Sequence, residues 1–400
     1  MKTLKHENVG ISTFLAFALI PISGFAMDVY IPSFPHMASE LHLSESDIKL
    51  TLTVYLVSYG LSQLFVGSIS DSFGRYRINL ISLLVLFLSS LGIAWSSNIH
   101  VILSLRLIQA IAISFIVVCK RAFFVDVFTG EKQKNYTSMV TVVWSTAPIL
   151  APFVGGFLQE AFGWRANFYF LALYALILLI LEWIYSGETL PKKQPFKLKS
   201  VMSMYRELLN ATDFSLGILV LGLSYSMIMV FSMNIAFIVE HEHHLTAVYS
   251  GYCALISGLA MFFGGLWSKK QINKPIYQKL QLSIRSQFII LAIMLSTALL
   301  FHQLYIMMAF VFLIHFWLGF SYNTYFTYSL TSRPHYAATA SGLASGGSYV
   351  IFSIASYVVV NLIDIKDQLT LGLAYLVLLV CVRLTLIVVR QALQKAPTVA

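Results

Sequence analysis

Long apolar segments separated by short polar stretches run along the whole chain of 400 residues. Each holds about 20 mostly apolar residues, the length that an α-helix needs to cross a bilayer core of about 30 Å. The segments are continuously hydrophobic rather than alternating, which excludes a transmembrane β-barrel. We place twelve of them at residues 12–35, 47–69, 79–97, 101–123, 136–158, 166–187, 213–238, 247–267, 285–302, 304–328, 338–362 and 370–390. The pattern therefore predicts an all-α membrane protein with twelve transmembrane helices.

One connection is longer than the others and divides the chain. Residues 188–212 are basic and contain Pro191 and Pro195. We expect two six-helix halves, residues 1–187 and 213–400, joined by a cytoplasmic linker at 188–212. Within this linker, residues 198–209 either form a short amphipathic helix at the membrane surface or belong to a flexible basic connection.

The positive charge of the chain is distributed by membrane side. The net charge is +9, from 26 Lys and Arg against 17 Asp and Glu. If the N-terminus is cytoplasmic, 21 of the 26 basic residues fall on the cytoplasmic side. This asymmetry is typical of membrane orientation, not of nucleic-acid binding. We expect a multi-pass protein of the bacterial inner membrane with both termini in the cytoplasm.

An acidic residue, Asp28, lies deep within the first apolar segment, and we regard it as the only acid placed so deeply in any segment. A carboxylate is costly in a membrane and usually marks a proton or substrate pathway. The plainer alternative is a tolerated acid near a helix end. Glu182, in contrast, lies near the inner end of its segment, where we expect it to reach the lipid headgroups.

The fourth apolar segment contains an arginine and a glutamine three residues apart, Arg106 and Gln109. A buried arginine needs an anion or carbonyl partners. With a rise of about 1.5 Å per residue, Asp28 and Arg106 both lie about 10 Å below the outer surface. We expect Arg106 and Gln109 to position Asp28 or tune its proton affinity. A purely structural ion pair is the alternative.

Two glycine-containing stretches predict close packing and moving helices. The connection after the second segment reads GSISDSFGRYR and contains Gly67, Asp71, Gly74, Arg75 and Arg77. Glycines allow a tight turn there, and Asp71 can cap a helix or meet a basic partner. The fifth segment contains two prolines, which let a helix bend, and a diglycine, which lets a neighbour approach. These are Pro148, Pro152, Gly155 and Gly156.

These stretches resemble motifs of one transporter family. Residues 67–77 resemble the G-x-x-x-D-x-x-G-R-x-R signature of the major facilitator superfamily, whose fold has two six-helix halves around a central cleft. Residues 106–110 are similar to the R-x-x-Q-G motif of its proton-coupled members, with Ala110 in place of glycine. Residues 148–156 resemble the motif of its antiporters. The second half keeps glycine and base at 264–270 but lacks the acid.

A finer resemblance is to the twelve-span drug:proton antiporters of the Bcr/CflA type, carried by residues 28–35, 53–67, 120–126 and 340–345. It implies proton-coupled efflux of small organic molecules or drugs by alternating access, with Asp28 exchanging the proton and Asp71 with Arg75 stabilising one gate state. Further candidates to line the cleft are Tyr30, Tyr55, Tyr59, Tyr225, Asn234, Tyr322, Asn323 and Tyr325. General helix packing explains such tyrosines equally well.

Other functions and sites receive less support. A dedicated exporter of one endogenous metabolite or siderophore fits the sequence as well, whereas import by proton symport is disfavoured by the antiporter motif. His315 fits a hydrogen-bonded core histidine better than a titrating group, and residues 240–244 fit a solvated turn better than a metal site. We expect no cofactor beyond the proton gradient, no nucleic-acid partner, no enzymatic activity and a monomer in the lipid bilayer.

Overall fold

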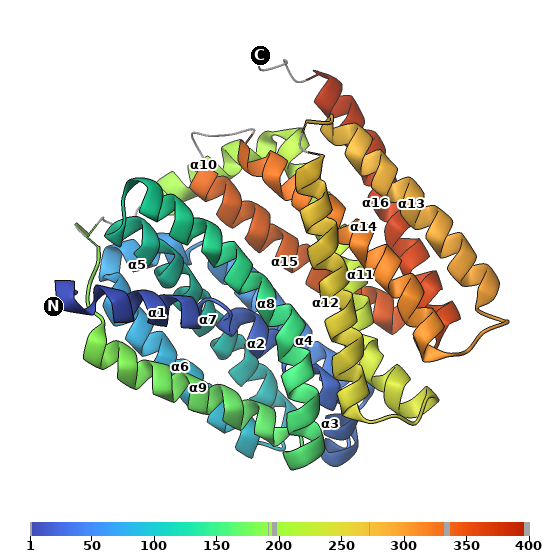
Figure 1. The fold of residues 1–400 in the computed structure, drawn as a ribbon, viewed down its shortest axis with the longest axis horizontal. Helices are drawn as coiled ribbons and strands as arrows, with labels where there is room; N and C mark the ends of the chain where they lie inside the picture. The colour runs from blue at the N-terminus through green and yellow to red at the C-terminus, as the bar shows by residue number, and fades with distance from the viewer. Residues whose placement is uncertain (1, 191, 194–197, 272, 332–336, 396–400) are drawn as a thin grey trace. The chain divides into compact units, whose positions relative to one another are not determined.

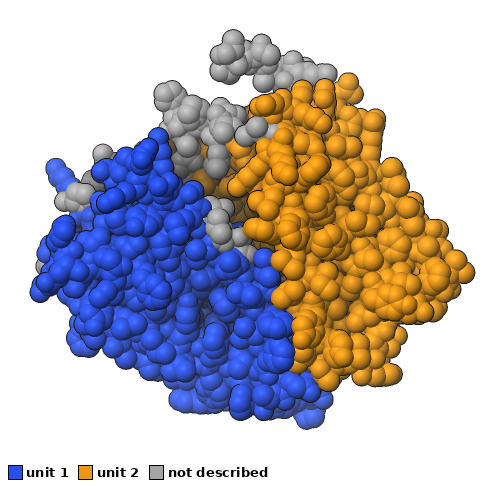
Figure 2. Space-filling model, in the orientation of Figure 1, with its two compact units in different colours: residues 1–197 blue, residues 198–400 orange. Residues whose placement is uncertain are grey.

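The computed structural model describes residues 2–190, 192–193, 198–271, 273–331 and 337–395, and its regular elements are helices (Figure 1). The chain separates into two compact units, residues 1–197 and 198–400, coloured blue and orange in Figure 2. The predicted linker is divided between them. Its later part forms helix α10, Leu198–Asn210, so the helical alternative for residues 198–209 is confirmed.

The first unit contains nine α-helices and two short 3₁₀ helices within its described residues. These are η1 His6–Asn8, α1 Val9–Leu19, α2 Ile22–Asp28, η2 Ile31–Ser33, α3 Phe34–Leu41, α4 Glu45–Gln63, α5 Val66–Phe73, α6 Arg75–Trp95, α7 Ile99–Val127, α8 Gly130–Phe162 and α9 Arg165–Tyr185. Helix α7 packs against both α4 and α6, while α8 packs against α2 and η2. These contacts join the second, third and fourth predicted segments and, separately, the first and the fifth.

The second unit begins with α10. It continues with α11 Thr212–Phe237, the π-helix η3 Ile238–Glu242, α12 Ala247–Lys270, α13 Ile276–Thr297, α14 Leu304–Thr331, α15 Ala337–Leu362 and α16 Gln368–Lys395. Helix α11 packs against α15 and α16, and α12 packs against α14. Lys269 and Lys270 occupy the last turn of α12, where positive charge complements the helix dipole.

All twelve predicted segments coincide with helices. In the described part of the chain ten helices are long and apolar enough to span a membrane, or eleven if α4 and α5 count as one span. Helix α8, with 33 residues, covers the remaining fifth segment. The predicted all-α fold is therefore confirmed, with ten or eleven candidate spans among the described residues.

Two of the predicted helices are not continuous. The second segment bends by 58° between α4 and α5. The first breaks after Leu19 and again after Asp28, where a turn and a 3₁₀ helix intervene before α3. Pro32 explains the second break, because it has no backbone N–H to return to the carbonyl of Asp28. The break places the acidic residue at the end of a half-helix.

Candidate functional site

The Asp28 carboxylate is buried at the end of α2. Its side chain is only 3% exposed, and among the described residues its Oδ2 atom has no hydrogen-bond partner. Arg106 is the charged group that acts on it electrostatically, but the described residues contain no ion pair between the two side chains. Arg106 instead binds the Ala26 carbonyl and the Tyr30 hydroxyl, two residues before and two residues after Asp28 in the chain.

Arg106 is fully buried and is held by other groups. Its Nη1 donates to the carbonyl oxygen of Ala26 at 3.0 Å and to Gln109 Oε1 at 2.5 Å. Its Nη2 donates to the Tyr30 hydroxyl at 3.2 Å. The guanidinium carbon lies 4.5 Å from the ring centre of Tyr30 and 4.2 Å from that of Tyr55. Two aromatic faces and three oxygen atoms therefore stabilise this cation in place of a carboxylate.

Polar bonds extend from Arg106 onto two further helices. Gln109 Nε2 donates to Ser90 Oγ on α6 at 2.9 Å. The Tyr30 hydroxyl bonds to Thr51 Oγ1 on α4 at 3.0 Å. Ser90 and Thr51 are both fully buried. Sequence reasoning missed these two residues, because a hydroxyl in an apolar helix usually bonds to its own backbone and gives no distinct signal.

Helix α8 approaches the backbone beside Asp28 very closely. A Cβ atom added to Gly155 would lie 1.6 Å from the carbonyl oxygen of Val29, the residue after Asp28. One turn further from the break, a Cβ at Gly24 would lie 2.6 Å from the Cβ of Ala147. Pro148 and Pro152 lie inside α8, and Gly156 is buried. The predicted antiporter motif is therefore packed directly against the half-helix that carries the carboxylate.

The predicted conformational motif forms a charged cluster where α5, α6 and α7 meet. Gly74 joins α5 to α6 with φ of 100°, a conformation that favours glycine. Arg75 donates to Asp71 Oδ1 from Nη2 at 2.8 Å and from Nε at 3.1 Å. Arg75 also pairs with Asp126 at the end of α7. Arg77 is exposed and Gly67 faces open space, so Asp71, Gly74 and Arg75 carry the described interactions.

Glu188, which follows α9, ties the N-terminal segment to this cluster. Its carboxylate accepts from the backbone N–H groups of Arg75 at 3.2 Å and Tyr76 at 3.3 Å, and so caps the start of α6. Its own backbone N–H donates to the carbonyl of Lys2 at 2.8 Å. The sequence alone assigns no role to Glu188 at the start of the predicted linker, because these partners are more than a hundred residues away in the chain.

Glu182 corrects an expectation. It does not reach the headgroups but is fully buried, with Lys120 Nζ donating to its Oε2 at 2.6 Å and Asn79 Nδ2 at 3.2 Å. Asp28 and Glu182 are therefore both buried acids of the first unit. Position along a segment gives approximate depth but does not say which face of the helix bears the residue. Here α9 directs Glu182 at α6 and α7.

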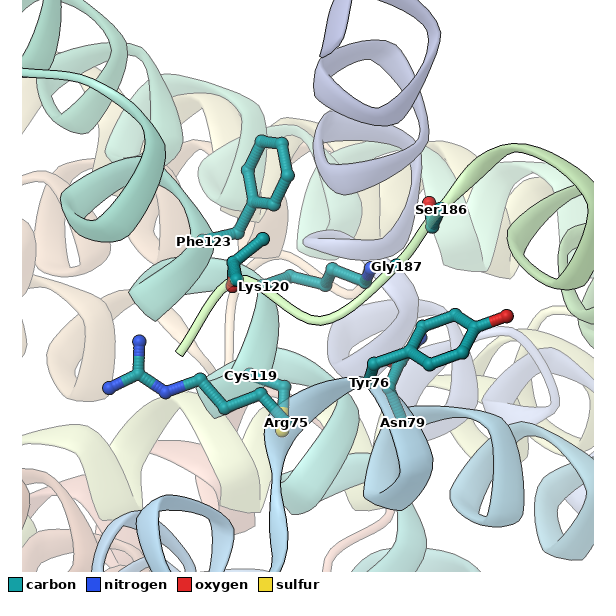
Figure 3. A pocket seen from close by; sticks show the side chains of 9 residues that line it. Arg75, Tyr76, Asn79, Cys119, Lys120, Phe123, Ser186 and Gly187 are labelled. Atoms are coloured by element: carbon teal, nitrogen blue, oxygen red, sulfur yellow. The ribbon is translucent and has the colours of Figure 1, made fainter. Parts of the chain in front are cut away.

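A small cavity lies beside this ion pair (Figure 3). Its volume of about 10 Å³ is close to that of one water-sized probe. It is lined by Arg75, Tyr76 and Asn79 of α6, by Cys119, Lys120 and Phe123 of α7, and by Ser186, Gly187 and Thr189 after α9. Arg75 and Lys120 both line the cavity, and its size admits no organic substrate.

The candidate cleft-lining tyrosines and asparagines are distributed over both units. Tyr59 stacks on Tyr55 with ring centres 6.1 Å apart, so Tyr30, Tyr55 and Tyr59 all belong to the surroundings of Arg106. In the second unit Tyr225 packs against Tyr322 at 5.4 Å.

The remaining residues of that set belong to two helices of the second unit. Asn234 donates to its own helix, at the carbonyl of Val230. Tyr325 donates to the carbonyl of Asp213 at 2.8 Å, and Asn323 accepts from Thr327 at 3.4 Å. These bonds lie within the second unit and give no sign of a ligand.

His315 is a hydrogen-bonded core histidine, as expected. Its Nδ1 lies 2.7 Å from Ser257 Oγ and its Nε2 lies 3.0 Å from the Tyr375 hydroxyl. Residues 240–244 form part of η3 and the turn after it. Searching the described residues finds no group of three or more His, Cys, Asp or Glu side chains arranged to hold a metal ion.

The fold and the buried charges define a multi-pass helical membrane protein. A family model, described as Major Facilitator Superfamily, matches residues 16–356. The chain belongs to this superfamily, as the sequence motifs predict, and is a membrane transporter rather than an enzyme.

Two named relatives match most of the chain at low identity, and a third matches less than half of it. The chain is 28% identical over 355 residues to the uncharacterized MFS-type transporter YdgK of Bacillus subtilis, covering 86% of this chain and 87% of that protein. It is 26% identical over 309 residues to a bicyclomycin resistance protein homolog of Haemophilus influenzae, covering 75% and 76%. A chloramphenicol resistance protein of Pseudomonas aeruginosa is 33% identical over 169 residues, covering 42% and 40%.

Solved structures of the superfamily share the fold. The xylose transporter XylE from E. coli, in an inward open conformation, superposes with a TM-score of 0.73 at 12% identity and covers 98% of both chains. The nucleoside transporter NupG gives a TM-score of 0.73 at 12% identity, covering 96% of this chain and 99% of its own. This likeness concerns the fold alone.

Proposed function

We propose that the protein is a proton-coupled antiporter that exports small organic molecules or drugs across the bacterial inner membrane by alternating access. The observation that carries the proposal is the Asp28 carboxylate, buried at a helix break beside Arg106 and without an ion-pair partner among the described residues. An ionised carboxylate so placed is costly unless a proton or a ligand neutralises it. Such a group is suited to binding and releasing a proton as its surroundings change.

Asp28 binds the proton and Arg106 makes its proton affinity depend on conformation. With the transporter open to the cytoplasm, substrate binds and Asp28 releases its proton. With the transporter open to the outside, substrate leaves and Asp28 is reprotonated. Movement of Arg106 toward the carboxylate favours the ionised form, and movement away favours the protonated form. Gln109 bonds to Arg106 and limits its movement.

The two motifs contribute to the conformational change. Tight contact between α8 and Val29 transmits any bending of α8 at Pro148 and Pro152 to the half-helix that ends at Asp28. The cluster of Arg75 with Asp71 and Asp126 stabilises one gate state, because its bonds join the start of α6 to α5 and α7. Both features support a transporter that moves between discrete states.

The substrate class is proposed from relatives. The names of two of them refer to bicyclomycin and chloramphenicol resistance, and others are called multidrug resistance proteins. These support export of drug-sized organic molecules. The proton gradient supplies the driving force without a cofactor, and the protein acts as a monomer with both termini in the cytoplasm.

Flux measurements on reconstituted protein test the proposal. Proteoliposomes are loaded with a pH-sensitive dye and an imposed pH gradient, and chloramphenicol, bicyclomycin and a wider drug panel are offered in turn. Antiport predicts that at least one compound moves against the proton flux and that each flux depends on the other. Movement of compound and proton in the same direction would show that the protein is a symporter and not an antiporter. Activity on one endogenous metabolite or siderophore alone, found by comparing the metabolite content of a deletion strain, would favour the dedicated exporter.

A further inference from the structure

Two helices, α7 and α4, are joined through Tyr30, in the turn before η2, by one chain of buried hydrogen bonds whose direction is fixed. Thr51 Oγ1 donates its only hydrogen to the carbonyl of Ile48 at 2.6 Å. It must therefore accept at its other contact, from the Tyr30 hydroxyl at 3.0 Å. Because the Tyr30 hydrogen is used in this way, the Tyr30 oxygen is available to accept from Arg106 Nη2 at 3.2 Å. The chain runs from Arg106 on α7 through Tyr30 to Thr51 on α4.

This chain holds the guanidinium in a defined orientation. Nη2 is bound by Tyr30, Nη1 is bound by Ala26 and Gln109, and the Tyr30 and Tyr55 rings cover its faces. Its Nε atom, in contrast, has no hydrogen-bond partner in the described part of the chain. Asp28 Oδ2 is likewise without a partner there. A donor and an acceptor of opposite charge thus remain in one buried site without bonding to each other.

Few other groups act on Asp28. Helices α4, α7 and α8 pack against α2. The titratable or charged side chains that face Asp28 are Arg106 from α7, Tyr55 from α4 and Tyr30 from its own segment. The described contact residues of α8 include Trp144, which donates to Ser23 of α2, and Ala147, Pro148 and Gly155, none of which titrates. The position of Arg106 is therefore the main electrostatic variable for Asp28.

We propose that Thr51 is a positioning residue for proton coupling, which holds Arg106 off the Asp28 carboxylate through the Tyr30 hydroxyl. Thr51 itself touches neither charged group. Without its hydroxyl, Tyr30 loses its acceptor and Arg106 is less firmly fixed. The guanidinium then pairs with Asp28, whose Oδ2 has no partner among the described residues, and favours its ionised form. This proposal rests on the proposed function, since it assigns the setting of the proton affinity on which antiport depends.

The test compares valine and serine at position 51 with a control on the same helix. Thr51→Val keeps the side-chain shape and removes the hydroxyl, whereas Thr51→Ser keeps the hydroxyl. Thr53→Val is the matched control, because the Thr53 hydroxyl is also buried but donates to the backbone carbonyl of Lys49 alone at 3.2 Å. Infrared difference spectroscopy of the full chain in lipid follows the C=O band of the protonated Asp28 carboxyl, assigned by its loss in Asp28→Asn.

For Thr51→Val we expect the pH of half-protonation of Asp28 to fall by about one unit, a tenfold loss of proton affinity. Thr51→Ser and Thr53→Val should titrate like the unaltered protein. If the unaltered band titrates and Thr51→Val does not lower its midpoint relative to Thr53→Val, the positioning role is overturned while the proposed function stands. If the band of the unaltered protein does not titrate at all, the proton-carrying role of Asp28 fails together with this inference.

Discussion

Arg106 is stabilised by groups other than a carboxylate, which leaves the Asp28 carboxylate free of an ion pair among the described residues. Its charge is met by two aromatic faces, a backbone carbonyl, an amide oxygen and a phenol oxygen. Lysine cannot reproduce this arrangement, because its ammonium is a compact point charge without a planar face. The residue is therefore suited to act on Asp28 without neutralising it permanently.

Replacing Arg106 with lysine should impair both stability and transport. Two or more hydrogen bonds from a charged group are lost, so the free energy of unfolding should fall by about 2–3 kcal/mol. Proton-driven flux in proteoliposomes should fall strongly. The exposed Arg285 provides the control, and Arg285→Lys should change neither quantity measurably. A fully active, equally stable Arg106→Lys would show that the planar guanidinium is unnecessary.

The buried pair of Lys120 and Glu182 gives a second prediction at this scale. Glu182→Leu alone leaves a buried cation and should destabilise the fold by about 3–5 kcal/mol. Lys120→Met combined with Glu182→Leu should recover most of that loss, because no charge remains to be desolvated. Thermal unfolding in detergent measures both.

The exposed pair of Lys366 and Asp364 is the control for that cycle. Its nitrogen and oxygen lie 2.6 Å apart at a site where both side chains are mostly exposed. Breaking it with Asp364→Asn should change stability by less than about 1 kcal/mol. Equal losses for Glu182→Leu and for the double variant would contradict the account of a costly unpaired lysine.

The sequence identifies charged residues more readily than their partners. Asp28 and Arg106 are recognisable because a charge within an apolar segment is conspicuous by itself. The pairing of Glu182 with Lys120 depends on how α9 is rotated against α7, and the segment pattern does not determine that rotation. The same reason hides Thr51 and Ser90, whose roles come from contacts between helices.

At the scale of elements, the interrupted first span packs closely against α8 through α2 and η2. The twelve segments are predicted well because length and hydrophobicity alone place them. The break after Asp28 was not predicted, although Pro32 was a signal for it, since a helix commonly ends before a proline. A continuous helix over residues 12–35 would have left the backbone beside Asp28 fully bonded. The observed break instead lets Gly155 of α8 reach the Val29 carbonyl.

Filling this contact should disturb transport without altering any charge. Gly155→Ala places a methyl group 1.6 Å from the Val29 oxygen, so α8 must move away from the half-helix. We expect proton-driven flux to fall at least tenfold in proteoliposomes containing equal amounts of folded protein. Gly10→Ala is the matched control, because nothing lies within 4 Å of an added Cβ there. Equal flux in the two variants would show that the close approach is dispensable.

At the scale of the whole molecule, charge asymmetry sets the proposed orientation. The basic residues 192–193 precede the second unit and are exposed, as is Glu242 at the end of η3. The topology predicts that these sites lie on opposite sides of the membrane. It also places the cluster of Arg75 at the cytoplasmic end, and Asp28 and Arg106 nearer the outer end.

Labelling of single cysteines tests this orientation. In a background without the three native cysteines, Glu242→Cys should react with a membrane-impermeant maleimide in intact cells from which the outer membrane has been removed. Lys193→Cys should react only after the inner membrane is permeabilised. The reverse pattern would invert the molecule and with it the direction of proposed export.

The most direct test of the central claim is proton-coupled flux through Asp28→Asn, measured beside the unaltered protein and the exposed control Asp364→Asn. Asparagine has nearly the same shape and cannot take up or release a proton. The account predicts that Asp28→Asn folds normally and exchanges substrate across proteoliposomes without a gradient, yet shows no substrate-linked proton movement. The control should couple fully. Wild-type coupling in Asp28→Asn would contradict the account, because the proton would then be carried elsewhere.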